Sequence, residues 1–526
     1  MNSSPPIDRL WLQAQQRFSG RDRDGARAAC EAVLAAQPGH SGAHLMLAII
    51  CGQQDQHRLA TGHAVAAAAR MASPTLQHVA AVASRLVAVG EYEQAFRLIR
   101  KVDVSRPGNP RFLVDLSQQL NILGRHDDAL LYLDAAIAHG YKGEAVNYLR
   151  GTYLRYLGRF EEAAEEFERS LVINPQLAYA HRALANLGLP AGREGRIERI
   201  RKALGQESLT DINRAYLGYA LFRELDAIDD TDAAWQALEE GASAQRRTVQ
   251  YDAGAEAALF DQLIAASGPG FVSPPSAGDP GITPIFILGM PRTGTTLVER
   301  ILGGHPQITL GGELNDFRQQ FKWATDHQCP GFIDSVGIGR LPGVDFAELG
   351  RRYLEHVAWR VPGTRYFTDK NPGNWMVAGL VLKALPQARI IHLRRNAMDA
   401  CFSNLKELFA PNFYPYSYRL EDLAGHYRNY TRLMAHWHEI APGRILDVCY
   451  EDLVSDPARE ARRLTDYCGL EFRPGQVHIE TNTAPVSTAS AVQVREAIHG
   501  RNVGGWKRYA SRLAPLERLL GDAAWA

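Results

Sequence analysis

The sequence has few of the features that would tie the protein to a disulfide framework, a nucleic acid or a membrane. Its six cysteines are scattered and form no Cys-x-x-Cys pair, so we expect reduced, mostly buried thiols and no zinc site. The 58 basic and 58 acidic residues balance, which argues against a nucleic-acid binder. No apolar run reaches the roughly 18 residues that a membrane span needs. Residues 1–6 lack the charged start and apolar core of a signal peptide, so a cytoplasmic protein is expected.

A fixed period organises the first half of the chain. Residues from about 8 to 250 are rich in alanine, leucine and charged side chains and predict one helix after another. Three segments place a glycine and an alanine 34 residues apart, namely Gly90-Glu91-Tyr92-Glu93-Gln94-Ala95, Gly124-Arg125-His126-Asp127-Asp128-Ala129 and Gly158-Arg159-Phe160-Glu161-Glu162-Ala163. This period resembles the tetratricopeptide repeat, in which the glycine ends one helix and the small alanine lets the next approach.

The repeats predict an all-α domain over residues 8–250, a right-handed stack of helical hairpins whose concave face could hold a partner or an extended peptide. The alternative is an appendage that only stabilises the chain or pairs it into a homodimer. Residues 267–281 are rich in glycine and proline, so they are expected to form a linker. The remaining part, residues 282–526, alternates apolar strand-like runs with amphipathic helices, which predicts an α/β domain with a parallel sheet.

A glycine loop follows the first strand of that domain. Residues 285–288 are continuously apolar, as in a strand buried on both faces, and apolar residues recur at helical spacing from Leu297 onward. Strand, glycine loop and helix together make an anion cradle, because glycines admit phosphate oxygens to backbone amides and the helix N-terminus favours negative charge.

The loop lacks one residue of a nucleotide-hydrolase phosphate loop. Thr295 stands where the lysine that reaches the terminal phosphates should be, which argues against transfer of a phosphoryl group from a nucleoside triphosphate. The loop instead resembles that of the sulfotransferases, which use 3′-phosphoadenosine 5′-phosphosulfate (PAPS) as donor. The resemblance implies that the 5′-phosphosulfate is held by Arg292, Thr293, Gly294, Thr295 and Thr296.

A second anion contact is expected after the strand at residues 389–393. An arginine at a strand end and a serine two helical turns later can converge on one anion. The resemblance assigns Arg395 and Ser403 to the 3′-phosphate. If the register is shifted by one residue, Arg394 takes the place of Arg395. The non-functional alternative is that both arginines face solvent at the edge of the strand. Tyr450, in a Tyr-Glu-Asp-Leu run that also resembles the family, is a further candidate for donor binding, although a tyrosine at a strand end usually packs.

Two residues are candidates for the chemistry. Glu313 resembles the glutamate base of tyrosylprotein sulfotransferases, and a partly buried carboxylate with a raised pKa could take a hydroxyl proton. His305 is a competing base, and an N-cap or surface carboxylate is the plain alternative for Glu313. Lys370 resembles the catalytic lysine of the family, which stabilises the leaving group. Asn374 and Trp375 are expected to shape the acceptor pocket.

The C-terminal segment resembles the family less closely. Ser490 and Gln493 keep the spacing of residues that close over the donor, and so does Trp506. Glu496 occupies the position expected for lysine, so Arg495 or Arg501 would have to replace it.

The sequence therefore predicts a tetratricopeptide-repeat solenoid followed by an α/β, P-loop-like sulfotransferase domain. The resemblance implies a PAPS-dependent enzyme that needs no metal and acts on a hydroxyl, such as a protein tyrosine presented by the repeats. A glycan, lipid or metabolite hydroxyl would leave the same donor motifs. Two alternatives stay open, a nucleotide-dependent kinase and a repeat scaffold with an inactive catalytic domain.

Overall fold

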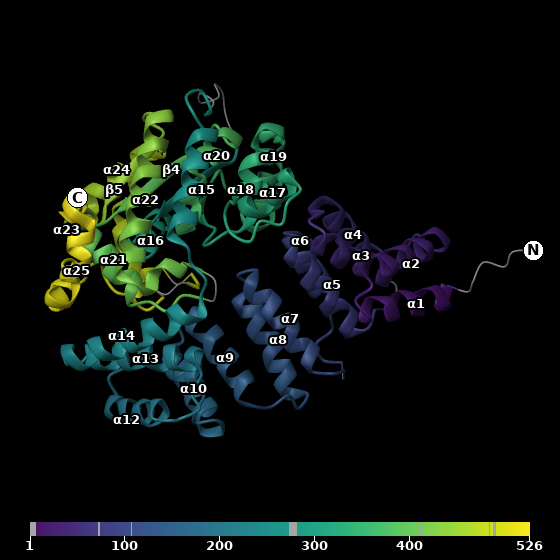
Figure 1. Ribbon diagram of the computed structural model, residues 1–526, viewed down its shortest axis with the longest axis horizontal. Coiled ribbons are helices and arrows are strands. Elements are labelled where there is room, and N and C mark those ends of the chain that lie inside the picture. The colour runs from purple at the N-terminus through teal and green to yellow at the C-terminus, as the bar shows by residue number, and fades with distance from the viewer. Residues whose placement is uncertain are drawn as a thin grey trace, which may run out of the picture. The chain divides into compact units, whose positions relative to one another are not determined.

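The computed structural model describes residues 7–71, 74–106, 108–272, 281–410, 413–482, 484–487 and 491–525 (Figure 1). Residues 273–280 of the predicted linker and Ser490 lie outside the described residues. The chain divides into two compact units, Met1–Lys142 with Asn315–Arg360, and Gly143–Leu314 with Val361–Ala526. Within the described ranges, no helix is both long and apolar enough to cross a membrane.

The first unit is helical. Its α-helices are α1 (Ile7–Ser19), α2 (Arg23–Ala36), α3 (Ser41–Gln53), α4 (His57–Ala69), α5 (Leu76–Ala88), α6 (Tyr92–Ile99), α7 (Arg111–Ile122), α8 (His126–Ala138), α17 (Asp316–Thr325), α18 (Ser335–Arg340) and α19 (Phe346–Val357). Consecutive helices pair as hairpins, as α7 and α8 do in Figure 1.

The second unit begins with further helical hairpins: α9 (Glu144–Tyr156), α10 (Phe160–Ile173), α11 (Ala178–Ala185), α12 (Arg193–Leu204), α13 (Asp211–Asp226), α14 (Thr231–Thr248) and α15 (Ala253–Ala266). Helices among and after the strands are α16 (Thr295–Gly303), α20 (Ala378–Ala384), α21 (Ala397–Leu405), α22 (Leu420–Ile440), α23 (Tyr450–Ser455), α24 (Pro457–Tyr467) and α25 (Ala510–Leu520).

The predicted glycine turns are present at each repeat. The three glycines have left-handed backbone, with φ of +84°, +73° and +81° at Gly90, Gly124 and Gly158. At each turn the amide of the next residue bonds a carbonyl five residues back at 2.9 Å: Glu91 to Leu86, Arg125 to Leu120 and Arg159 to Leu154. The alanines of the period are fully buried. The tetratricopeptide pattern is thus confirmed as helical hairpins.

The second unit contains a five-stranded sheet in the order β2-β3-β1-β4-β5. All of its pairings are parallel, as predicted. The strands are β1 (Thr283–Gly289), β2 (Ile308–Leu310), β3 (Tyr366–Asp369), β4 (Arg389–Arg394) and β5 (Ile445–Cys449). The chain moves from β1 to one side and returns past it to β4, so the carboxyl end of β1 lies where such sheets bind ligands.

The sheet has a buried core on both faces. Every residue of β1 is buried. Ile287 and Leu393 pack with Ile301 of α16 and Leu464 of α24 on one face. On the other face His392 contacts Tyr430 of α22, because strand residues alternate between faces.

The last repeat-side helix packs on the α/β core. Glu256 of α15 accepts a hydrogen bond from His426 of α22 at 2.9 Å. Helices α9–α15 therefore share a compact unit with the sheet, while α1–α8 belong to the other unit. The boundaries at residues 250 and 282 stay a prediction.

Two glycine substitutions test the repeat turns. Gly124 and Gly62, both in the first unit, have open space where a Cβ would lie, but only Gly124 has a positive φ. Gly124→Ala should lower the free energy of unfolding by about 1 kcal/mol, because a left-handed alanine is strained. Gly62→Ala, inside α4, should raise it by about 0.5–1 kcal/mol. Urea unfolding measures both, and an equal effect of the two substitutions would contradict the assigned turn.

Candidate active site

The loop after β1 follows a backbone path that glycine permits. Gly289 has φ of +149° and Gly294 has φ of +112°, and Arg292 between them adopts φ of +67°. A Cβ on Gly294 would lie 2.7 Å from the Tyr450 ring, and one on Gly289 would lie 2.5 Å from the Leu393 carbonyl. Both glycines are therefore required by close packing as well as by their conformation.

Side chains hold three successive carbonyls of this loop. The Thr293 hydroxyl donates to the Met290 carbonyl at 2.8 Å. Asn404 of α21 donates to Pro291 at 2.8 Å, and Arg395 donates to Arg292 at 3.0 Å. The first amides of α16, at Thr295 and Thr296, have no partner inside their own helix. A loop fixed in this way presents backbone donors to an anion at the helix N-terminus.

Arg395 joins the loop to α21, as the sequence predicts. Its Nη1 lies 3.4 Å from the Ser403 hydroxyl, and its guanidinium lies 4.6 Å from the centre of the Tyr450 ring. Its Nε is buried and has no hydrogen-bond partner in the protein. Arg394, the register alternative, is half-exposed and lies 3.8 Å from Asp447. The structure thus brings Arg395, Ser403 and Tyr450 to the loop, and Tyr450 both packs there and faces the arginine.

Glu313 and Lys370 form an ion pair. The Lys370 Nζ donates to Glu313 Oε1 at 2.7 Å, and the Lys370 amide bonds the Gly312 carbonyl at 2.9 Å. Lys370 is almost fully buried, whereas the Glu313 side chain is 40% exposed. The Glu313 carboxylate is thus partly covered and reaches solvent, while the Lys370 ammonium group lies in the interior. The assignment of Glu313 as the base stays a prediction.

Glu299 of α16 is a buried carboxylate that sequence reasoning missed. It accepts hydrogen bonds from the Gly312 amide at 3.0 Å and the Thr368 hydroxyl at 2.8 Å. Burial raises the pKa of Glu299, and Lys370 opposes that rise. Glu299 thereby positions the segment that carries Glu313. A glutamate one turn beyond Thr295 on an otherwise apolar helix face was the available signal.

Two other candidates of this region, His305 and Trp375, are buried. His305 accepts a hydrogen bond from the Gln307 amide at 3.2 Å, in the turn before β2. Trp375 packs against Phe260 and Tyr430, and its expected place in an acceptor pocket stays a prediction.

Asp369 is a residue that bears on the kinase alternative. It ends β3, is buried, and accepts a hydrogen bond from Asn374 at 3.1 Å. The sheet therefore has an aspartate at the end of a strand, a residue type that binds Mg²⁺ in nucleotide-hydrolysing enzymes. The missing loop lysine at Thr295 still argues against a phosphoryl-transfer site.

The C-terminal segment reaches the loop through Gln493. Its side-chain oxygen accepts a hydrogen bond from Arg292 at 3.3 Å. Arg495 lies against the turn between α9 and α10, where it donates to the Tyr156 carbonyl at 3.3 Å. Arg501 is exposed and pairs with Glu496. The assignment of Arg495 to the donor stays a prediction.

Repeat helices also supply charges next to the loop. Glu407, just after α21, is buried and pairs with Arg182 of α11 at 2.7 Å and with Arg223 of α13 at 3.0 Å. Burial raises the pKa of Glu407, but the guanidinium groups of Arg223, Arg182 and Arg292 hold it below its usual value. This carboxylate therefore couples the repeat helices to the phosphate loop.

Lys406 adds to an excess of positive charge. Burial, helped by Arg223, Arg292 and Arg395, lowers the pKa of Lys406 to about 7. Nearby cations disfavour one another unless an anion lies between them. Three carboxylates lie among these cations, namely Glu407, Asp226 near Lys406 and Asp399 at 3.8 Å from Arg395. The cations outnumber them, so the region suits a negatively charged ligand. Lys406, one turn after Ser403, is a second site residue that sequence reasoning missed.

The parallel sheet and the glycine loop at the carboxyl end of β1 define a P-loop-like α/β domain. Residues 284–474 match the model of the sulfotransferase family. The C-terminal part of the chain is thus a sulfotransferase-family domain, and tetratricopeptide-repeat helices precede it.

Two relatives and one solved structure illustrate the similarity. An uncharacterized protein from Aquifex aeolicus (strain VF5) is 29% identical over 381 residues, which cover 70% of this chain and 49% of that protein. Protein-tyrosine sulfotransferase 2 from Gallus gallus is 24% identical over 202 residues, covering 37% of this chain and 53% of that protein. The chain thus spans about half the length of these relatives. The sulfotransferase domain of the Synechococcus PCC 7002 olefin synthase has 19% identity and a TM-score of 0.31, covering 44% of this chain and 90% of that structure.

Removing the charge of Glu407 tests the coupling between repeat helices and loop. Glu407→Gln should lower the free energy of unfolding by about 3 kcal/mol near neutral pH, because Arg182 and Arg223 lose a buried partner. A carboxyl whose folded pKa is depressed contributes stability above the ordinary glutamate pKa of about 4.3 and loses it as the pH falls. The difference between the proteins should therefore shrink in acid.

The matched control is Glu168→Gln, which breaks an exposed bidentate pair with Arg199. We expect a change within about 0.5 kcal/mol, since exposed ion pairs contribute little. Equal losses for the two variants, measured by urea unfolding across pH, would contradict a special role for Glu407.

Proposed function

We propose that the protein transfers a sulfuryl group from PAPS to the hydroxyl group of an acceptor. The observation that carries this proposal is Arg395, which bonds the phosphate loop, lies beside Ser403 and keeps a buried Nε without a protein partner. The Nη2 group of Arg395 donates to the Asn502 carbonyl, so Nε is the donor that would remain for the 3′-phosphate of a bound nucleotide. The sulfotransferase-family match over residues 284–474 supports the same donor.

The described residues fit this donor. Thr293, Gly294, Thr295 and Thr296 would surround the 5′-phosphosulfate together with Arg292, while Arg395 and Ser403 would hold the 3′-phosphate. The left-handed path at Gly294 brings backbone close to an anion, and Tyr450 prevents a side chain there. The bound donor supplies an activated sulfuryl group whose bond to the 5′-phosphate oxygen is the one broken.

Glu313 would accept the proton of the acceptor hydroxyl, and Lys370 would stabilise the leaving group. The acceptor oxygen forms a bond to sulfur, its proton passes to the Glu313 carboxylate, and the electron pair of the broken bond remains on the phosphate. Lys370, held beneath Glu313 at 2.7 Å, would stabilise the negative charge that develops on that phosphate. Fixed cations and backbone amides provide the neutralisation in this scheme, so it needs no metal.

A peptide tyrosine is the acceptor that we favour. Three partly exposed tyrosines lie on alternate helices of the repeat region: Tyr148 on α9, Tyr179 on α11 and Tyr216 on α13. Their ring centres are 4.5 Å and 6.4 Å apart, which makes a continuous aromatic row. Arg182 lies 5.8 Å from the Tyr216 ring and pairs with Glu407 near the loop. Such a row suits an extended peptide, and the Gallus gallus relative is named as a protein-tyrosine sulfotransferase.

Donor binding is tested with 3′-phosphoadenosine 5′-phosphate in calorimetric titrations. Arg395→Ala should weaken binding by about 1.5–3 kcal/mol, or roughly 10- to 150-fold in Kd, because a charged hydrogen bond to the 3′-phosphate is lost. Arg394→Ala is the matched control, since the neighbouring guanidinium faces Asp447 instead. Its Kd should stay within about twofold of the original. A larger loss in Arg394→Ala than in Arg395→Ala would overturn the assignment.

The role of Glu313 is tested by the rate at which PAPS is converted to 3′-phosphoadenosine 5′-phosphate, with a tyrosine peptide or water as acceptor. Glu313→Gln should lower kcat by about 100- to 10,000-fold, as expected for loss of a general base. Its affinity for 3′-phosphoadenosine 5′-phosphate should stay the same, because Glu313 contacts the acceptor side. Unchanged kcat would exclude Glu313 as the base.

A further inference from the structure

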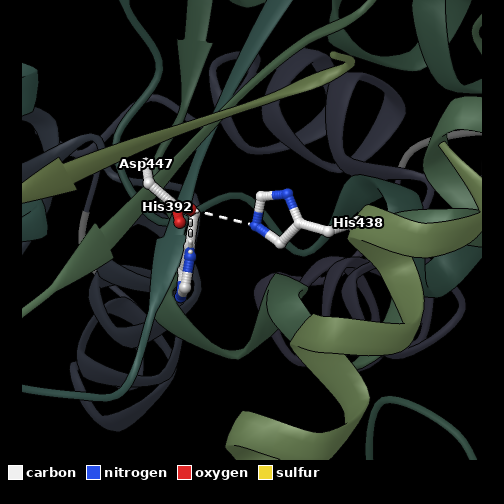
Figure 2. Close-up of side chains that lie close together, drawn as sticks. All are labelled: His392, His438 and Asp447. Atoms are coloured by element: carbon white, nitrogen blue, oxygen red, sulfur yellow. Dashed lines mark hydrogen bonds and ion pairs between the residues drawn. The ribbon is translucent and has the colours of Figure 1, made fainter. Parts of the chain in front are cut away.

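A cluster outside the proposed transfer site combines two histidines and an aspartate. His392, His438 and Asp447 come together beside the sheet (Figure 2). Their potential ligand atoms all lie within 4.8 Å of one another, and no other such group of three occurs among the residues that the structure describes. The proposed sulfuryl transfer uses none of these side chains.

Three elements bring the cluster together. His392 of β4 and Asp447 of β5 are direct neighbours in the parallel pairing. His438 reaches them from the last turn of α22. His392 Nδ1 lies 2.8 Å and His438 Nε2 lies 3.0 Å from the same oxygen, Asp447 Oδ1. Figure 2 shows both imidazole rings directed at this carboxylate.

A contact with Tyr430 of α22 fixes the orientation of the His392 ring. Its ring is buried, and its Nε2 contacts the hydroxyl group of Tyr430. Histidines that bind metal generally use the second ring nitrogen for such a hydrogen bond, which sets the tautomer and aims the first nitrogen. Nδ1 of His392 is thereby directed at Asp447.

The other side of the cluster is open. The side chains of His438 and Asp447 are 35% and 34% exposed, so an ion and a water molecule can approach them. Two histidine nitrogens and one carboxylate oxygen are a frequent zinc ligand set, with water in the fourth position. Mg²⁺ and Ca²⁺ prefer oxygen ligands throughout, so this set does not suit them. The positive charge of Arg394 would repel a cation at this site, and its Nη1 lies 3.8 Å from Asp447 Oδ2. The Arg394 side chain is half-exposed, so it has room to move into solvent when an ion binds.

We propose that His392 Nδ1, His438 Nε2 and Asp447 form a binding site for one divalent transition-metal ion, with Zn²⁺ the best fit. Ligand atoms around zinc lie farther apart than hydrogen-bonded atoms do. The carboxylate and the His438 ring, both partly exposed, would move outward by a few tenths of an ångström to admit the ion. The other arrangement of the same groups is a hydrogen-bonded His-Asp-His chain without an ion.

The test is calorimetric titration of the chelator-treated full chain with Zn²⁺ alone, followed by visible absorption with Co²⁺. We expect one ion per chain and the absorption of tetrahedral cobalt without thiolate charge-transfer bands, which separates this site from the six cysteines. His438→Gln and Asp447→Asn should each weaken zinc binding at least about tenfold, since even hydrogen-bond partners of zinc ligands contribute 10- to 100-fold.

The matched control is His436→Gln on the same helix, whose ring bonds Ser267 instead. It removes one histidine without touching the cluster and should leave the zinc affinity unchanged. Circular dichroism and thermal melting confirm that each variant is folded. Absence of one-to-one zinc binding, or equal affinity in His436→Gln and His438→Gln, would overturn the proposal. Neither result bears on sulfuryl transfer, because no nucleotide takes part.

Discussion

The backbone of the loop after β1 is the constraint on which the candidate active site depends. The loop takes left-handed conformations at Arg292 and Gly294, which the chain would not keep without support. Thr293, Asn404 and Arg395 provide that support by bonding three successive carbonyls. Two of these residues are far away in sequence, on or just before α21. The loop conformation therefore depends on the packing of β4 and α21 beside β1.

The same constraint involves two of the repeat helices, α11 and α13. Arg182 and Arg223, on α11 and α13, neutralise Glu407 directly behind Arg292. The Tyr219 hydroxyl on α13 also donates to the Leu405 carbonyl at the end of α21, at 2.9 Å. Side chains of the repeat helices α11 and α13 thus help to hold the segment that supports the loop. The loop conformation therefore depends on α11 and α13 as well as on the sheet.

The sequence was sufficient to predict the elements with strong local patterns. The 34-residue glycine period fixed the helical hairpins, because a left-handed glycine recurs at each turn. The apolar runs of β1, β4 and β5 identified the centre and one side of the parallel sheet. The short strands β2 and β3 were missed, since three or four residues carry too little pattern to identify a strand.

The candidate site residues likewise separate into those with a local sequence pattern and those without one. Arg395 and Ser403 were predictable because one strand–helix unit carries both. Glu299, Lys406 and Glu407 were not, because their importance comes from burial and from partners distant in the chain. The ion pair between buried Lys370 and partly exposed Glu313 likewise joins residues that are distant in the chain. Sequence motifs thus pointed to the proposed anion contacts, while the partners of Glu299, Lys406 and Glu407 became visible only in the folded structure.

The most direct test of this account follows the label during turnover. The protein is incubated with an acceptor mixture of tyrosine peptides and small hydroxyl compounds, and with either sulfur-labelled PAPS or terminally phosphorus-labelled ATP with Mg²⁺. The account predicts a stable sulfur-labelled product and no phosphorus-labelled one. Phosphorus transfer would contradict it by making the domain a kinase, and transfer of neither label, with no binding of 3′-phosphoadenosine 5′-phosphate, would leave only a repeat scaffold.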